Sequence, residues 1–210
     1  MLTQRTKVRR NPKRGHHDRP TIDAILDEAL IAHVAWVHDG RPAVIPTLIA
    51  RDGDDLLIHG SSASRTLRGL RQGLEACVEA TLVDGLVLAR SAFHHSINYR
   101  SVILYGTLRD APDKERALEI FTEKLIPGRW EHVRRPTEQE LKGTAALALR
   151  IEEGSAKVRT GPPVDDDEDY ALDAWAGVVP LRTVAGAPEP DPLLDAGVAL
   201  PTHVRALTET

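Results

Sequence analysis

The stretch that decides the fold reads His59-Gly60-Ser61-Ser62-Ala63-Ser64-Arg65. It follows a short apolar run and precedes a helical repeat of leucines at Leu67, Leu70 and Leu74. A glycine and serines before a helix leave its first amide groups free, and such amides bind anions. Arg65 lies in the first turn, where a cation is unfavourable unless an anion lies there too. We interpret the stretch as a candidate phosphate site, with ordinary capping and a surface arginine as the alternative.

Upstream of this stretch, three short apolar runs are separated by two turn signals. The runs cover residues 31–37, 42–50 and 56–58, and the turns contain Asp39-Gly40 and Asp52-Gly53. Tight Asp-Gly turns join antiparallel strands, so the pattern predicts a three-stranded meander. Pro46 lies inside the second run, which indicates an edge strand or a bulge at that point.

Downstream, the sequence predicts further strands and two helices. Strands are expected at 74–83, 86–89, 102–108, 144–151 and 156–159, and helices at 113–126 and after a capping box at Thr137. Earlier in the chain, Thr21 is expected to cap a short helix, and Asp84-Gly85 is expected to be a turn. Residues 90–101 place polar side chains between apolar strands. Such groups need hydrogen-bonding partners, and a bound polar ligand is one source of them.

The chain of 210 residues divides into three parts by composition. Residues 1–20 form a basic arm, which we interpret either as a solvated terminus or as a segment that packs on a partner subunit. Residues 21–160 hold the periodic apolar segments of one domain. Residues 161–210 form an acidic linker, expected to be solvated over 165–169, and a proline-containing arm that packs on the domain or on a partner subunit.

Composition and motifs argue against several function classes. The net charge of -4 gives no reason to expect a nucleic-acid partner. No apolar run is long enough to span a membrane, and the single cysteine allows no internal disulfide, so a cytoplasmic protein is expected. The histidine pairs His16-His17 and His94-His95 are adjacent and therefore point apart, so we expect no metal site. Phosphate-loop, dinucleotide and nucleophile-elbow motifs are missing.

The order of these features resembles the pyridoxamine 5'-phosphate oxidase-related family, in the FMN-binding branch that includes the nitroimidazole-resistance reductases. The features that carry the resemblance are the meander, residues 59–65, the helix after them, Leu74-Glu75-Ala76-Cys77, and Asn98-Tyr99-Arg100-Ser101-Val102 with Tyr105-Gly106. The resemblance runs from about Asp23 to Val158. It implies a mainly β fold with helices, namely a six-stranded Greek-key FMN-binding split barrel, and a homodimer with FMN at its interface.

The resemblance also implies which residues meet the cofactor. It places the FMN phosphate near Ser61, Ser64 and Arg65, and the flavin ring against backbone atoms of the second strand. It places residues 98–101 at the ribityl chain, the phosphate or the ring edge, and an aromatic residue from the partner subunit near the flavin. The expected cofactor-binding set is Pro46, Thr47, His59, Ser61, Ser64, Arg65, Asn98, Tyr99, Arg100, Ser101 and Trp175.

These expectations lead to a redox function. A flavin brings its own chemistry, which explains why no protein nucleophile or general base stands out. The first function class is an FMN-dependent oxidoreductase that acts on a small molecule such as a nitro compound or a quinone. The alternatives are a non-catalytic flavin or haem-binding protein and a deazaflavin-dependent reductase. Residues 200–207 carry only His203 and Arg205, without the substrate-phosphate pattern of a true pyridoxamine phosphate oxidase. Vitamin B6 synthesis is therefore not expected.

Overall fold

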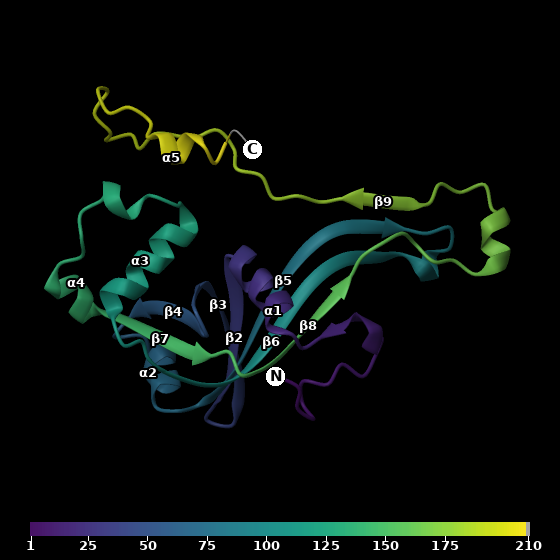
Figure 1. Ribbon diagram of the computed structural model, residues 1–210, viewed down its shortest axis with the longest axis horizontal. Coiled ribbons are helices and arrows are strands. Elements are labelled where there is room, and N and C mark those ends of the chain that lie inside the picture. The colour runs from purple at the N-terminus through teal and green to yellow at the C-terminus, as the bar shows by residue number, and fades with distance from the viewer. Residues whose placement is uncertain (209–210) are drawn as a thin grey trace.

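The computed structural model describes residues 1–208, and antiparallel strands dominate it (Figure 1). The strands are β1 (Gly15–His16), β2 (Ile31–His38), β3 (Arg41–Asp52), β4 (Asp55–Ser61), β5 (Glu75–Leu88), β6 (Ser96–Asp110), β7 (Thr144–Arg150), β8 (Glu153–Arg159) and β9 (Gly177–Pro180). The helices are α1 (Arg19–Glu28), α2 (Arg65–Arg71), α3 (Lys114–Leu125), α4 (Glu138–Gly143) and α5 (Thr202–Arg205), with short 3-10 turns η1 (Pro12–Arg14), η2 (Ala92–His94), η3 (Trp130–His132) and η4 (Asp167–Ala171).

Six of the strands described in residues 1–208 close into a barrel. The meander β2–β3–β4 continues through β7 to β6, while β5 pairs with β2 on the other side. A pairing between β5 and β6 closes the ring. The spatial order β5-β2-β3-β4 is a Greek key, in which the fourth strand returns beside the first. The predicted six-stranded Greek-key barrel is confirmed, and β1, β8 and β9 extend it at its edges.

The barrel interior holds the main hydrophobic core. Alternation along the strands sends Val34, Ile58 and Leu104 inward, and each is at most 1% exposed. Helix α1 covers this core with Ile22, Ile25 and Leu26. Burial of an aliphatic side chain of this kind stabilises the fold by about 1.5–3 kcal/mol.

Helix α1 begins three residues earlier than the sequence analysis predicted. Its N-cap is Asp18, whose carboxylate accepts hydrogen bonds from the Thr21 backbone N–H at 2.9 Å and from the Thr21 hydroxyl at 2.7 Å. Thr21 therefore lies inside the first turn and is not the cap. Both residue types favour caps, and here the carboxylate accepts the free amide while Pro20 fills an early helical position.

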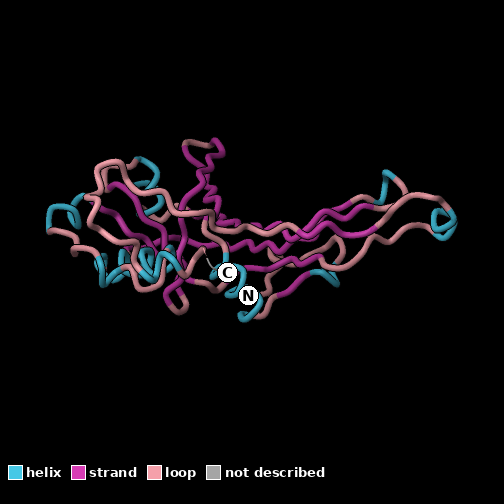
Figure 2. Tube along the Cα trace, turned by 90° about the horizontal axis from the view of Figure 1, so that it is seen from above, coloured by secondary structure: helices cyan, strands magenta, loops and turns pink. Residues whose placement is uncertain are grey.

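The strands β5 and β6 form a long hairpin that projects from the barrel (Figure 2). The expected turn at Asp84-Gly85 was wrong, because β5 is continuous and only its register shifts between Val83 and Gly85. Strand β9 pairs with β5 beside this bulge. A Cβ at Gly85 would lie 3.0 Å from the Val179 carbonyl oxygen, so glycine allows the close approach of β9.

The two terminal segments behave differently. The basic N-terminal arm packs on the barrel of its own chain, because Thr6 is buried, β1 pairs with β8, and Arg5 forms ion pairs with Glu75 and Glu153. Most residues of the arm are still exposed to solvent, as expected, but Arg5, Thr6 and β1 attach it to its own chain. The C-terminal segment leaves β9, runs back along the molecule and ends near α3 with α5 (Figure 1). None of the helices in residues 1–208 combines the length and the apolar character of a membrane span.

Candidate functional site

A groove lies between the β2–β3 hairpin and the start of α2. It encloses about 240 Å³ and continues into a shallower depression of about 510 Å³. We call both together the hairpin groove, and its lining residues are Trp36, His38, Asp39, Arg41, Pro42, Ala43, Val44, Ile45, Arg65 and Thr66. The groove therefore combines an apolar floor with two guanidinium groups, which suits a planar ligand that carries an anionic group.

The start of α2 is fixed by local hydrogen bonds from the serine stretch. The Ser64 hydroxyl accepts from the Leu67 N–H at 3.4 Å, and the Ser61 hydroxyl accepts from the Ala63 N–H at 3.2 Å. Buried Leu67 anchors the helix, and a Cβ at Gly60 would lie 3.0 Å from its side chain, so glycine permits this contact. Arg65 is consequently held at the groove, and its predicted contact with a phosphate stays a prediction.

The two arginines at the groove have no bonded partner in the described part of the chain, although the Asp39 carboxylate also lines the depression. Within residues 1–208, the guanidinium groups of Arg65 and Arg41 form neither an ion pair nor a hydrogen bond, and both residues are exposed. A guanidinium binds phosphate through parallel hydrogen bonds, and such charge-assisted bonds are stronger than neutral ones. The hairpin groove therefore has the donors that a phosphate group requires.

Strand β3 offers the groove an open edge. Its residues 41–48 pair with β2, but β4 pairs only with Ile49 to Asp52. Pro46 has no N–H to leave unpaired on that edge, as its sequence position indicated. Pro46 is exposed and Thr47 is half-buried, and they follow Ile45 of the groove. The free backbone groups of this edge are donors and acceptors for a ring with polar edges.

His59 does not line the hairpin groove. It lies beneath α3, where its ring contacts that of Phe121 with centroids 4.3 Å apart. Its Nδ1 is buried and lacks a hydrogen-bond partner among the residues described, and burial lowers its pKa. His59 thus borders the second hydrophobic cluster, formed by α3 and the outer faces of β3, β4 and β7.

Two of the four polar residues at 98–101, Asn98 and Arg100, form hydrogen bonds with other residues of the chain. Asn98 is buried and donates to the Gly161 carbonyl at 3.2 Å, and its Oδ1 accepts from Arg159. Arg100 binds the Asp84 carboxylate at 2.7 and 2.9 Å and also binds Glu28. These carboxylates raise the pKa of Arg100. Ser101 donates weakly to a backbone carbonyl at 3.5 Å, and Tyr99 is half-buried.

Arg100 borders a second hollow, which we call the arm cavity. It measures about 980 Å³ and lies between the barrel and the returning C-terminal arm. Its lining residues are Glu28, Leu30, Leu82, Val83, Asp84, Arg100, Pro180, Leu181, Arg182, Thr183, Val184, Ala185 and Leu207. Trp175 lies before β9 with 69% of its surface exposed, outside both hollows. Its predicted contact with a partner's flavin stays a prediction.

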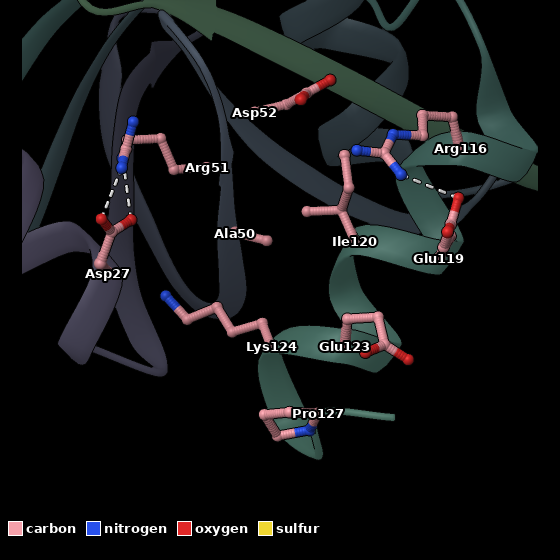
Figure 3. A pocket seen from close by; sticks show the side chains of 10 residues that line it. All are labelled: Asp27, Ala50, Arg51, Asp52, Arg116, Glu119, Ile120, Glu123, Lys124 and Pro127. Carbon is pink, nitrogen blue, oxygen red and sulfur yellow. Dashed lines mark hydrogen bonds and ion pairs between the residues drawn. The ribbon is translucent and has the colours of Figure 1, made fainter. Parts of the chain in front are cut away.

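A third hollow of about 500 Å³ separates α1, β3 and α3 (Figure 3). The Arg51 guanidinium faces the Asp27 carboxylate there, at 2.8 Å from Nε to Oδ1. The Lys124 ammonium donates to the Leu26 carbonyl at 2.6 Å, and burial lowers its pKa to about 8. Because these charged groups already have partners, we assign no ligand to this hollow.

The structure adds residues that the sequence analysis missed. Trp36, His38 and Arg41 surround the tip of the β2–β3 hairpin and reach the groove. One signal for them was present, because positions 36 and 38 share one face of a strand. In the sequence, Asp39-Gly40 indicates only the turn, and the side chains beside it were not predicted to form a site.

A closed Greek-key barrel with a cationic helix start beside an open strand edge defines a class, the split barrels of pyridoxamine 5'-phosphate oxidase type. A family model described as Pyridoxamine 5'-phosphate oxidase matches residues 18–158, and the chain belongs to this family. No curated protein matches the chain.

Two solved structures are similar to almost the whole chain. The flavocytochrome Anf3 from Azotobacter vinelandii is 42% identical, with a TM-score of 0.91 over 98% of this chain and 97% of that protein. An FAD and haem-binding protein from Mycobacterium smegmatis is 44% identical, with a TM-score of 0.90 over 93% of this chain and 97% of that protein. A Bacteroides thetaiotaomicron protein assigned to 5-nitroimidazole antibiotic resistance is 18% identical, with a TM-score of 0.58 over 69% of this chain and 86% of that protein, and shows the shared fold.

Proposed function

We propose that this chain is a flavin-binding redox protein that also carries haem. The observation that carries the proposal is the similarity to a flavocytochrome and to an FAD and haem-binding protein, at 42% and 44% identity. This similarity covers 98% and 93% of the chain, so it extends well beyond the barrel. It favours flavin and haem together over the flavin-only oxidoreductase that the sequence analysis placed first.

The hairpin groove supports the flavin part of the proposal. Arg65 is the proposed partner of a flavin phosphate, and the Ser61 and Ser64 hydroxyls retain protons that they can donate to it. The open edge of β3 holds the polar edge of the ring, while Trp36 and Ile45 exclude water. A bound flavin would supply hydride and single-electron transfer. The chain's own residues then bind and orient the cofactor.

The flavin itself is proposed to be FAD. The sequence predicted FMN, because residues 59–65 offer a cradle for one phosphate. The structure adds a second unpaired guanidinium, Arg41, in the depression next to Arg65. FAD carries two linked phosphates, so two neighbouring cations favour it over FMN.

We also propose that a second copy of the chain completes the flavin site. Val37 and Val44 lie at or beside the groove with 60% and 61% of their surfaces exposed. Phe93, in η2 between β5 and β6, and Trp175, just before β9, are 89% and 69% exposed. Exposed apolar side chains in this number are typical of surfaces that a partner covers.

We propose that the substrate with which the bound flavin exchanges electrons is a small molecule.

The visible spectrum and the size of the purified protein test these proposals. We expect flavin bands together with a Soret band, FAD in the supernatant after heat denaturation, and a dimer by light scattering. FMN in the supernatant would contradict the proposal of FAD and would support the FMN that the sequence predicted. A protein without flavin after reconstitution, a deazaflavin band, or a monomer that still binds flavin tightly would overturn the corresponding part.

A further inference from the structure

The far end of the β5–β6 hairpin carries a group of side chains that the proposed function does not use. His94 lies in η2, Asp166 caps η4, and Asp169 lies within η4. One ligand atom from each of the three lies within 4.8 Å of the other two. The His94 Nε2 and the Asp166 Oδ2 are 3.2 Å apart. We call these three residues the tip cluster.

A buried carboxylate holds the two halves of the tip cluster together. The Asp165 side chain is fully buried and accepts from the Arg90 N–H at 3.0 Å, the Ser91 N–H at 3.4 Å and the Arg90 guanidinium at 3.2 Å. The expectation that residues 165–169 are a solvated linker was therefore wrong at Asp165. These bonds fix residues 165–171 against the turn that carries His94, so the backbone segments that carry the three ligands already lie side by side.

The orientation of His94 is also constrained. The Phe93 ring meets the His94 ring edge to face, with centroids 5.1 Å apart. The neighbouring His95 turns away and bonds the Ser91 carbonyl oxygen through Nδ1 at 2.9 Å. The two adjacent histidines thus point apart, as their positions predicted, but the second and third ligands come from another segment.

The tip cluster has an excess of negative charge. Asp166 and Asp169 belong to an acidic run, and the nearby Arg90 already binds Asp165 and stacks on Tyr170. Two carboxylates at this separation repel each other, and a cation between them would remove the repulsion. The Asp166 side chain is 73% exposed, so an ion can enter from solvent.

We propose that the tip cluster binds a divalent transition-metal ion through His94 Nε2 and the carboxylates of Asp166 and Asp169. Imidazole with carboxylates suits zinc and similar ions, whereas magnesium and calcium prefer oxygen ligands alone. Three protein ligands leave coordination positions for water. The proposal is independent of the hairpin groove, since it uses none of the groove's residues.

Calorimetric titration of the full-length protein with Zn²⁺, after treatment with a chelator, tests the proposal. We expect one zinc site per chain that His94→Ala weakens by at least about tenfold. His95→Ala is the matched control, since it removes the adjacent histidine and should leave zinc affinity unchanged. Asp166→Asn should lower the affinity for zinc. Asp167→Asn removes the same charge outside the cluster and should leave the affinity unchanged. Circular dichroism checks that each variant folds, and Asp169→Asn replaces any variant that does not.

Several outcomes would overturn the proposal. One is a wild-type protein without zinc binding at this site. A second is an equal loss in the Asp166→Asn and Asp167→Asn variants, which would mean diffuse attraction to the acidic run. A third is loss of haem in place of zinc on His94→Ala, read from the Soret band, which would make His94 a haem ligand. Calcium competing as well as zinc would also contradict the assigned metal class.

Discussion

Arg65 and Arg100 were both expected to meet the flavin, and the structure places them in opposite chemical situations. Arg65 is exposed at the start of α2, and no carboxylate within residues 1–208 pairs with it. Arg100 is held between Asp84 and Glu28, which together raise its pKa. The first guanidinium is available to a ligand, whereas the second already binds two carboxylates.

The difference shows that the availability of an arginine depends on remote partners. Glu28 comes from the end of α1, and Asp84 comes from the bulge of β5. One cation between two carboxylates leaves a net negative charge, which repels a phosphate. Arg100 itself is therefore not available to a phosphate, and Arg65, which is unpaired within residues 1–208, makes the hairpin groove the better candidate for an anion site.

The largest expected effect is on flavin binding after Arg65→Ala. The fold should remain, because Leu67 and Leu70 still bury α2. Loss of a charge-assisted hydrogen bond should weaken the flavin nucleotide by about 1.5–3 kcal/mol, which is roughly tenfold to a hundredfold or more in Kd. Fluorescence titration of the apoprotein with FAD and FMN measures this.

Two controls sharpen the Arg65 experiment. Riboflavin lacks the phosphate, so wild type and Arg65→Ala should bind it alike. Arg68→Ala removes an exposed arginine one turn further along α2 and should change the nucleotide affinity less. Equal weakening of riboflavin and the nucleotides would show that Arg65 supports the structure and that the phosphate lies elsewhere.

Arg100→Met should lower the stability of the fold and leave flavin binding almost unchanged. The substitution leaves Glu28 and Asp84 facing each other without a cation, and both are partly exposed, so the loss should be about 1–2 kcal/mol. Chemical denaturation measures it, and flavin affinity should change by less than about twofold. Adding Glu28→Gln and Asp84→Asn should restore part of the stability. If Arg100→Met lowered flavin affinity as much as Arg65→Ala does, Arg100 would contact the flavin and the contrast between the two arginines would be wrong.

The predictions that succeeded depend on neighbours in sequence. The capping box at Thr137 forms as expected, with Thr137 and Glu140 each bonded to the other's backbone N–H. Helix α3 covers Lys114–Leu125, against an expected 113–126. The meander also follows its Asp-Gly turns. In each case residues within a few positions decide the local structure.

The failures involve partners from distant segments. Asp84-Gly85 has a turn sequence, yet the pairing with β9 keeps β5 continuous through it. Asn98 bonds Gly161 and Arg159, so its burial needs no ligand, and its predicted contact with the cofactor stays a prediction. The tip cluster was missed for the same reason, because Asp166 and Asp169 follow His94 at a long distance along the chain. A local motif predicted that Arg65 lies at the start of a helix, but local motifs cannot predict contacts between segments that are far apart along the chain.

The arm cavity beside Arg100 depends on how the C-terminal arm is held. At its end, the His203 ring in α5 stacks on the His132 ring of η3, with centroids 4.6 Å apart and planes inclined by 6°. The His203 Nε2 is buried without a hydrogen-bond partner in the part of the chain described. Burial, with His132 and Arg129 nearby, lowers the pKa of His203, and Glu123 opposes this shift. The docked arm therefore favours a neutral imidazole.

Acid should accordingly release the arm, which is the smallest of the expected effects. In the released arm His203 regains its ordinary pKa of 6.5, above that of the docked state. The released state therefore binds more protons, so docking is complete well above pH 6.5 and weakens as the pH falls through that value. Hydrogen-exchange protection of α5, corrected for the intrinsic rate at each pH, should fall between about pH 7.5 and about pH 5.5. His203→Gln stays neutral and should lose this pH dependence, whereas the exposed His95→Gln at the other end of the molecule should keep it. Equal protection of the wild-type arm at both pH values would show that the stacked histidines do not control docking.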